Sequence, residues 1–216
     1  SDSPALLSTA GAAQVVEQAL AVGLEPAASE VRLTVDAPLP GVVRHARGAL
    51  AVGPDGRFRL EARGPLGPPT WVLVGDGRST TVLLPSTREA RPLGLPLLGP
   101  LVAGRLPHDL TLRMARRDGP LVHASFTDPH GLPLHAVLGA DGSLVRVRVG
   151  HREHPSVDLG YGPPTDQGLP RWLTVELPDL AVAVRVEPTG WTPADPPSSA
   201  FDTAPMGFVT PAPERR

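Results

Sequence analysis

Residues 54–67 read Pro-Asp-Gly-Arg-Phe-Arg-Leu-Glu-Ala-Arg-Gly-Pro-Leu-Gly, and this stretch decides the fold class. Phe58, Leu60 and Ala62 alternate with charged residues, a period of two that is typical of a β-strand with one buried face. The Pro-Asp-Gly sequence just before them is typical of a hairpin turn. The stretch therefore predicts a strand that enters from an antiparallel hairpin.

The same alternation recurs along the chain. The further runs are Val31-Leu33-Val35, Leu110-Leu112-Met114, Val145-Val147-Val149, Leu173-Val175-Leu177 and Leu180-Val182-Val184-Val186. The further hairpin signals are Gly75-Asp76-Gly77, Pro129-His130-Gly131 and Ala140-Asp141-Gly142. Because short connections join antiparallel neighbours, we expect a mainly β (α+β) fold. Its core would be a curved, half-closed antiparallel β-barrel of roughly nine to eleven strands.

Two segments depart from this pattern. Between Pro4 and Gly23, apolar residues recur at helical spacing and predict one amphipathic helix, with Ser3 as its N-cap. Its apolar stripe consists of Ala12, Val15, Val16, Ala19 and Leu20. Residues 91–105 are apolar but rich in proline and glycine, so they allow only a short or broken helix. We expect this second segment to lie across the concave face of the sheet as a lid, or equally to be ordinary core.

Composition excludes several classes of function. The 20 basic residues are all arginine and face 22 acidic residues, and aromatic residues make up only 4%, which argues against a nucleic-acid binder. The chain has no cysteine, so thiolate catalysis and cysteine-ligated zinc are excluded. No nucleophile-elbow or phosphate-loop spacing is present. We therefore expect no enzymatic activity, no cofactor and no metal.

His151 and His154 form a His-Arg-Glu-His sequence that resembles a metal-ligand spacing. Pro155 favours a turn there, and on an extended segment the two rings would not share a face. We therefore do not predict a metal site at this pair.

Many inward-facing residues of such a sheet are Leu, Val and Ala rather than large aromatics, so a lipid-sized apolar cavity is expected. The residues predicted to line it, lid included, are Leu33, Val35, Phe58, Leu60, Leu73, Leu97, Leu98, Leu101, Val102, Leu112, Val147, Leu173, Val175, Val182 and Val184. This domain would cover residues 1–187. Residues 188–216 are proline-rich and predict an extended tail that Trp191, Phe201 and Phe208 anchor to the body.

The order of these elements resembles the LolA/LolB lipoprotein-localisation family, and LolB more than LolA. The resemblance spans residues 4–186. It rests on Phe58-Arg59-Leu60-Glu61-Ala62-Arg63 followed by Gly64-Pro65-Leu66-Gly67, on Trp71-Val72-Leu73-Val74, and on the Ala103-Gly104-Arg105-Leu106-Pro107 end of the apolar segment. Asp141-Gly142-Ser143-Leu144-Val145 and Gly168-Leu169-Pro170 complete it. Cavity aromatics are fewer here than in the family, and the proline-rich tail is unusual.

The resemblance implies a protein that holds lipoprotein acyl chains and delivers them to the outer membrane. It implies that Pro65, Leu66 and Gly67 form a membrane-insertion loop with Leu66 at its tip. It further implies a LolA-type carrier as partner, the periplasmic face of the outer membrane as location, and an N-terminal acyl anchor whose cysteine this chain lacks. We expect a monomer.

Four alternatives stay open. The chain could be a soluble periplasmic carrier of lipoprotein or lipid, or a sensor or scaffold module of the cell envelope. Leu66 could also fold back onto the barrel instead of probing a membrane. Arg57, Arg59 and Arg63 share one strand face and could meet phospholipid headgroups, although such a row is more often simply solvated.

Overall fold

The computed structural model describes residues 4–37, 44–64, 67–77, 79–93 and 98–211, and they fold into two compact units. The first unit comprises residues 1–23, 35–42 and 104–185, and the second comprises residues 24–34, 43–103 and 186–216. Each unit is therefore assembled from segments that are distant in the sequence. Strands β1 (Ala27–Asp36) and β13 (Val182–Pro188) contain residues of both units.

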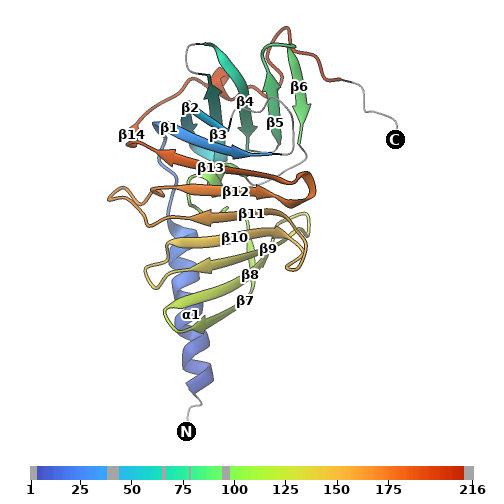
Figure 1. Ribbon diagram of the computed structural model, residues 1–216. Coiled ribbons are helices and arrows are strands. Elements are labelled where there is room, and N and C mark those ends of the chain that lie inside the picture. Colours follow the sequence, from blue (N-terminus) through green and yellow to red (C-terminus); the bar gives the residue numbers. More distant parts are fainter. Residues whose placement is uncertain (1–3, 38–43, 65–66, 78, 94–97, 212–216) are drawn as a thin grey trace. The chain divides into compact units, whose positions relative to one another are not determined.

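The first unit is a meander of antiparallel strands with one helix. Its strands are β7 (Thr111–Asp118), β8 (Leu121–Thr127), β9 (Pro133–Leu138), β10 (Leu144–Gly150), β11 (Pro155–Tyr161) and β12 (Leu173–Leu177). Each pairs with the next in chain order, as Figure 1 shows. The short 3₁₀ helix η2 (Pro178–Leu180) follows the last of them.

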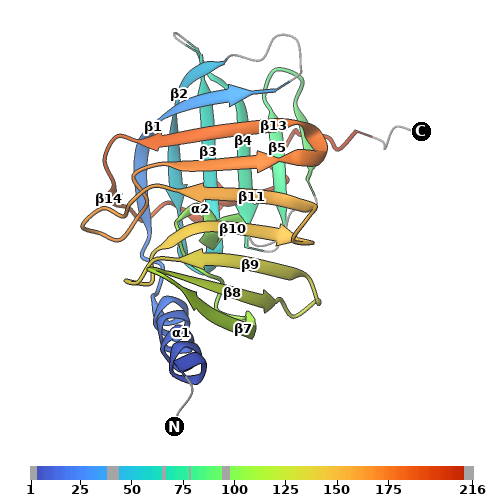
Figure 2. The ribbon, with the colours of Figure 1, turned by 60° about the horizontal axis from the view of Figure 1, so that its bottom comes forward.

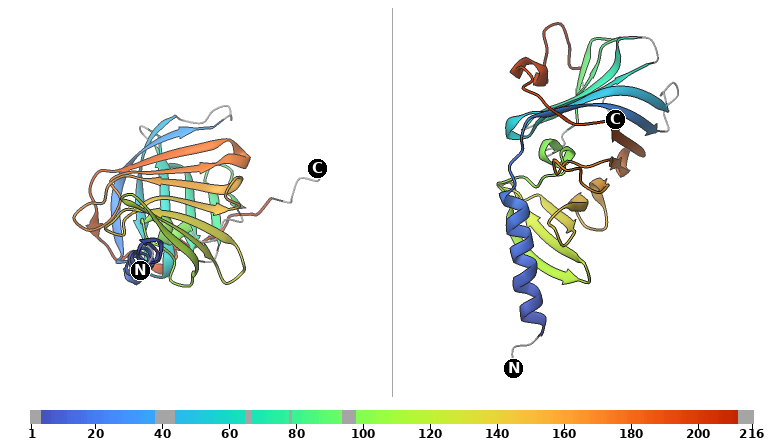
Figure 3. Two further views of the ribbon diagram at one scale, coloured as in Figure 1. Left: turned by 90° about the horizontal axis from the view of Figure 1, so that it is seen from below. Right: turned by 90° about the vertical axis from the view of Figure 1, so that its left-hand side faces the viewer.

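Helix α1 (Pro4–Ala21) packs on β7 and β8 of this unit (Figure 3). Ala12, Val15, Val16 and Ala19 are buried, whereas Gln14, Glu17 and Gln18 are exposed. The predicted amphipathic helix and its small apolar stripe are confirmed. Small side chains allow the helix axis to approach the sheet closely.

The second unit is also an antiparallel meander. Its strands are β2 (His45–Val52), β3 (Arg57–Arg63), β4 (Pro69–Asp76), β5 (Thr80–Leu84) and β6 (Glu89–Pro92), which follow β1 in spatial order (Figure 2). The two-residue strand β14 (Thr192–Pro193) pairs with β1. The remaining elements are α2 (Leu98–Val102) and the 3₁₀ helices η1 (Pro54–Gly56) and η3 (Ser198–Phe201). Within the described residues, no helix is long and apolar enough to span a membrane.

The predicted fold class, an open and mainly antiparallel β-sheet with few helices, is confirmed. The described residues contain 14 strands, more than predicted, because short strands such as β6 and β14 carry too few residues to show alternation. The predicted turns around Asp55, His130 and Asp141 all join consecutive antiparallel strands. Asp55 and Gly56 have φ values of 58° and 74°, which are the left-handed values that a tight hairpin connection needs.

Two β-bulges overturn part of the predicted alternation. The register shifts between Leu112 and Met114 in β7 and between Leu144 and Arg146 in β10. An inserted residue moves the following side chains to the other face of the sheet. Met114 and Val145, both predicted to face inward, are consequently 54% and 39% exposed.

Candidate functional site

Two adjacent strands of the second unit carry large apolar side chains that are only half-buried. Trp71 and Leu73 lie on β4, and Val82 and Leu84 lie on β5. Leu73 pairs directly with Val82, and the register places Trp71 beside Leu84. Because cross-strand partners point to the same side of a sheet, the four side chains share one face. We call these four residues the β4–β5 patch.

The neighbouring strand β3 extends the apolar face on which this patch lies. Leu60 and Ala62 of β3 are buried and pair with Leu73 and Trp71, respectively. The polar side chains of β3 alternate with these residues and therefore point to the opposite face. Glu61, for example, pairs with Val72, which lies between Trp71 and Leu73 and points away from the patch. The patch is therefore the partly open margin of an apolar surface. Such a surface binds flexible apolar groups without directional bonds.

The apolar segment predicted as a lid contains the short helix α2, which packs on η1, β3 and β4. Leu98, Leu101 and Val102 are buried in it. Gly99 packs so closely on η1 that a Cβ atom there would collide with the carbonyl oxygen of Gly56. A short helix in this segment is thus confirmed, while its role as a lid stays a prediction. Leu97 lies outside the described residues.

The remaining residues predicted to line a cavity fall into two groups. Those that are buried are Leu33, Val35, Phe58, Leu60, Val147 and Leu173. Those that are half-buried are Leu73, Leu112, Val175, Val182 and Val184. The half-buried residues retain some access to a ligand, whereas the buried ones are core. Contact with an acyl chain stays a prediction for all of them.

The predicted membrane-insertion loop connects β3 and β4. Pro65 and Leu66 lie outside the described residues, and Gly67 is exposed. The role of Leu66 therefore rests on the resemblance alone.

Arg57, Arg59 and Arg63 project from the face of β3 opposite to Leu60, as predicted. Two of them contact the C-terminal segment. The Arg57 guanidinium lies 5.8 Å from the centre of the Phe201 ring, and Arg59 Nη1 donates a hydrogen bond to the Ala200 carbonyl oxygen at 3.2 Å. The C-terminal segment thus covers part of a row predicted to be solvated, and only Arg63 is exposed.

A row of polar side chains crosses the first unit from β8 to β12. Cross-strand pairing places Ser125, His135, Arg148, Asp158 and Glu176 side by side in this order. Asp158 is the centre of an ionic cluster. Arg146 reaches it through Nε at 2.8 Å and Nη2 at 2.6 Å, and Arg148 reaches it through Nε at 3.1 Å.

The row contains a serine–histidine pair that the sequence analysis missed. Ser125 Oγ and His135 Nδ1 are 3.1 Å apart. Burial, followed by the charges of Arg152 and Arg148, lowers the pKa of His135 below its ordinary value. The next side chain in the row is the cation Arg148, not the carboxylate that orients the base in a catalytic triad. The arrangement therefore lacks a triad's third group at this position.

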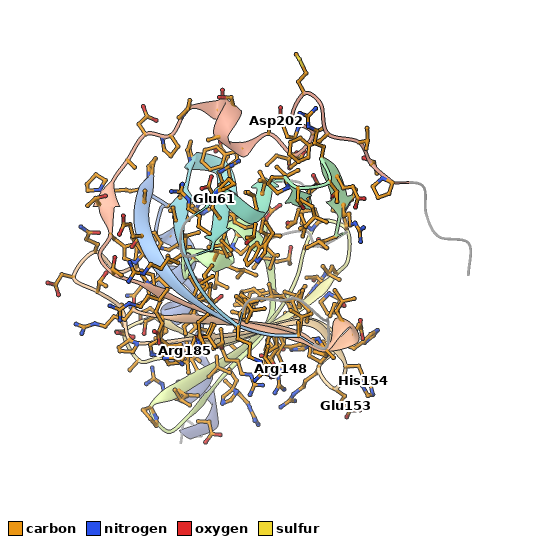
Figure 4. All side chains as sticks on the ribbon, turned by 45° about the horizontal axis from the view of Figure 1, so that its top comes forward. Glu61, Arg148, Glu153, His154, Arg185 and Asp202 are labelled. Carbon is orange, nitrogen blue, oxygen red and sulfur yellow. The ribbon has the colours of Figure 1, made fainter. Side chains whose placement is uncertain are left out.

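A polar surface pocket of about 640 Å³ adjoins the row. Its lining consists of Arg148, Arg152, Glu153, His154, Pro155, Asp158, Pro178 and Asp179. Figure 4 shows Glu153 and His154 together near Arg148. Opposite charges line the pocket, so it favours neither anions nor cations strongly. His151 and His154 are exposed in the turn after β10, and no three potential metal ligands come together within the described residues.

Sequence reasoning named Leu73 but missed its three companions in the β4–β5 patch. The spacing of two between Trp71 and Leu73, and between Val82 and Leu84, was an available signal. What could not be known was the register, which brings these two pairs together.

No protein-family model matches the chain, and no curated protein matches it. Among solved structures, the chain is similar to a LolA superfamily protein from Nitrosomonas europaea, with a TM-score of 0.56 at 12% identity. The match covers 88% of this chain and 97% of that chain. The fold is LolA-like.

A second similar structure is a domain assigned to outer membrane lipoprotein sorting from Vibrio parahaemolyticus. Its TM-score is 0.53 at 6% identity, and the match covers 83% of this chain and 90% of that chain. The predicted resemblance is thereby confirmed at the level of the LolA-like fold. The closer resemblance to LolB stays a prediction.

Proposed function

We propose that the chain binds the acyl chains of lipoproteins and delivers them to the outer membrane, without a chemical step. The β4–β5 patch, a half-buried apolar surface on a LolA-like fold, is the observation that carries this proposal. The similarity to a lipoprotein-sorting domain supports the choice of ligand. The cross-strand pairs Leu73–Val82 and Trp71–Leu84 would contact the acyl chain.

Simple energetics explain why such a protein is needed. A buried methylene is worth about 0.8 kcal/mol, so exposing an acyl chain of about 14 methylenes to water costs on the order of 11 kcal/mol. Aliphatic side chains recover much of this cost and form no directional bonds with the ligand. A membrane or protein that binds the acyl chain more tightly can then receive the lipoprotein, because the difference in affinity alone drives the transfer.

Delivery would follow the LolB-like scheme. A LolA-type carrier would supply the lipoprotein at the periplasmic face of the outer membrane, and Leu66 would enter the bilayer as the acyl chains leave. An N-terminal acyl anchor would hold the protein at that membrane. These steps rest on the family resemblance.

Native mass spectrometry with an acylated lipoprotein, and separately with its non-acylated form, tests the binding step. We expect a complex with the acylated form only, and a weaker complex for Leu73→Gln. The matched control is Leu180→Gln in η2, because Leu180 is 55% exposed and lies outside the patch. Equal binding of both lipoprotein forms, or no complex with either, would refute acyl-chain binding and favour a scaffold role.

The Leu66→Glu variant distinguishes delivery of a lipoprotein into a membrane from binding and transport of the lipoprotein. An acceptor that inserts lipoproteins should lose transfer to liposomes but retain cargo in the mass-spectrometric assay. Unchanged transfer by this variant would support the alternative of a soluble LolA-like carrier.

A further inference from the structure

Among the residues that the structure describes, three buried side-chain atoms of the first unit have no hydrogen-bond partner within the protein: Nε of Arg105, the hydroxyl oxygen of Tyr161 and Oγ1 of Thr165. Burying a polar atom without a partner is costly, and such atoms are rare in folded proteins. Two of the three belong to residues that face one small pocket. A polar atom without a protein partner beside a pocket is available to a water or to a polar ligand group.

Arg105 and Tyr161 both line a pocket of about 20 Å³ that is partly open to solvent. The other lining residues are Gly104, Ser143, Leu144, Gly162, Pro164, Gly168 and Pro170. The volume admits little more than one water-sized group. A ligand would therefore place only a small polar end inside, and its remainder would stay in the solvent.

The backbone holds the Arg105 guanidinium in position. Nη1 donates to the carbonyl oxygen of Gly168 at 2.6 Å and to that of Gly104 at 3.4 Å. Both glycines have left-handed backbone angles, with φ near 70°. At Gly168 a Cβ atom would lie 2.8 Å from Nη2 of Arg105, so the absence of a side chain there makes room for the guanidinium.

The charge of this guanidinium has no counter-ion among the described residues: no carboxylate forms a salt bridge with Arg105. Burial lowers its pKa from the ordinary value. The Arg105 side chain is half-buried, and within the described residues its guanidinium meets only the carbonyl oxygens of Gly168 and Gly104. An ordered water would satisfy the hydrogen bonds but would leave the charge unbalanced, whereas an anion would do both.

We propose that Arg105 and Tyr161 form a binding site for the carboxylate group of a ligand. A carboxylate has two acceptor oxygens on a small planar group, which match the Nε donor and the phenolic donor. The site lies within the first unit and is independent of the β4–β5 patch. It adds a polar recognition element to a protein otherwise proposed to bind apolar chains.

The chain contains a single tyrosine, so ¹³Cζ-labelled tyrosine gives one NMR resonance that reports on this site. We expect a saturable shift of that resonance on titration with acetate at constant ionic strength, and none with chloride. Arg105→Gln should weaken acetate binding by about tenfold or more, because it removes a charge-assisted hydrogen bond. The matched control is Arg116→Gln, which removes an exposed arginine of the same unit and should bind acetate normally.

Tyr161→Phe keeps the site testable if the Arg105 variant fails to fold. Because the hydroxyl has no hydrogen-bond partner among the described residues, this variant should unfold at the same temperature as the parent or above it. Acetate should raise its melting temperature less than that of the parent.

An equal shift with chloride would overturn the carboxylate assignment. Absence of any acetate-dependent shift, together with a lower melting temperature of ligand-free Tyr161→Phe, would show that the pocket holds only a water molecule. Octanoate distinguishes two sources of the carboxylate: tighter binding than acetate indicates a fatty acid, and equal binding indicates the carboxylate alone. Acetate has no long alkyl chain, so its binding does not depend on the proposed acyl-chain binding.

Discussion

Glu61 lies between two arginines on the polar face of β3. Arg59 Nε and Arg63 Nη2 each approach one of its carboxylate oxygens at 2.7 Å. Burial raises the pKa of Glu61, but the hydrogen bonds from Arg63 and Arg59, with their charges, outweigh it and hold the pKa below the ordinary 4.5. Because the folded-state pKa is the lower one, this carboxylate stabilises the fold above about pH 4.5, and the contribution is lost as the pH falls through the folded-state value.

Glu61→Gln should therefore lower the free energy of unfolding by about 1 kcal/mol at neutral pH. It should also make the loss of stability between about pH 6 and about pH 3 shallower. Urea denaturation across that range measures both effects. Glu89→Gln, which breaks the more exposed pair with Arg91, is the control and should cost less than about 0.5 kcal/mol. Parallel pH profiles of Glu61→Gln and the parent would contradict this account.

Glycine has opposite roles in the two helices. A Cβ atom at Gly11 in α1 would meet no atom within 4 Å, whereas one at Gly99 in α2 would collide with the backbone of η1. In the first case glycine only weakens the helix. In the second it is what allows α2 to dock. The same residue type is thus dispensable in one element and required in the other.

Gly11→Ala should raise the free energy of unfolding by about 0.5 to 1 kcal/mol, because alanine is the better helix former. Gly99→Ala should lower it by about 1 to 3 kcal/mol, because neither backbone can yield easily. Thermal and urea denaturation of the two variants provide the comparison. A Gly99→Ala protein as stable as its parent would mean that α2 does not pack on η1 as described.

The C-terminal segment contributes to the core of the second unit. Phe201 of η3 is only 2% exposed and packs in a cluster with Val72, Val74, Leu83 and Ala90. We expect Phe201→Ala to lower the free energy of unfolding by about 3 to 5 kcal/mol. Phe208→Ala, at a half-buried position beside the same cluster, should cost less. Equal and small losses in urea denaturation would show that this segment only lies loosely on the sheet.

At the scale of the whole molecule, the proposed function predicts how affinity depends on the ligand. If a chain of methylenes is transferred from water to an apolar surface, each methylene contributes about 0.8 kcal/mol. Affinity should then rise roughly tenfold for every two methylenes added, until the apolar surface is filled. Competition between a fluorescent fatty acid and a series of acylated peptides measures this dependence, with the unacylated peptide as control. An affinity independent of chain length would contradict acyl-chain binding.

Local patterns in the sequence determined the elements of this protein. The alternation around Phe58 and Leu60 predicted β3, the helical spacing of Val15, Val16 and Ala19 predicted α1, and the turn residues predicted the hairpins between them. These patterns can be read directly because strand and helix periods are properties of residues that are neighbours along the chain. They sufficed for the mainly antiparallel β fold class, whereas the LolA-like fold was predicted from the resemblance in element order.

Only the tertiary structure decided which residues meet across strands. Strand register placed Trp71 and Leu73 beside Leu84 and Val82, and set Ser125 beside His135. Two bulges turned Met114 and Val145 outward. Register and bulges depend on pairing between strands, which the periodicity of one strand does not encode. The pocket of Arg105 and Tyr161, residues 56 positions apart, likewise exists only because the folded chain brings them together.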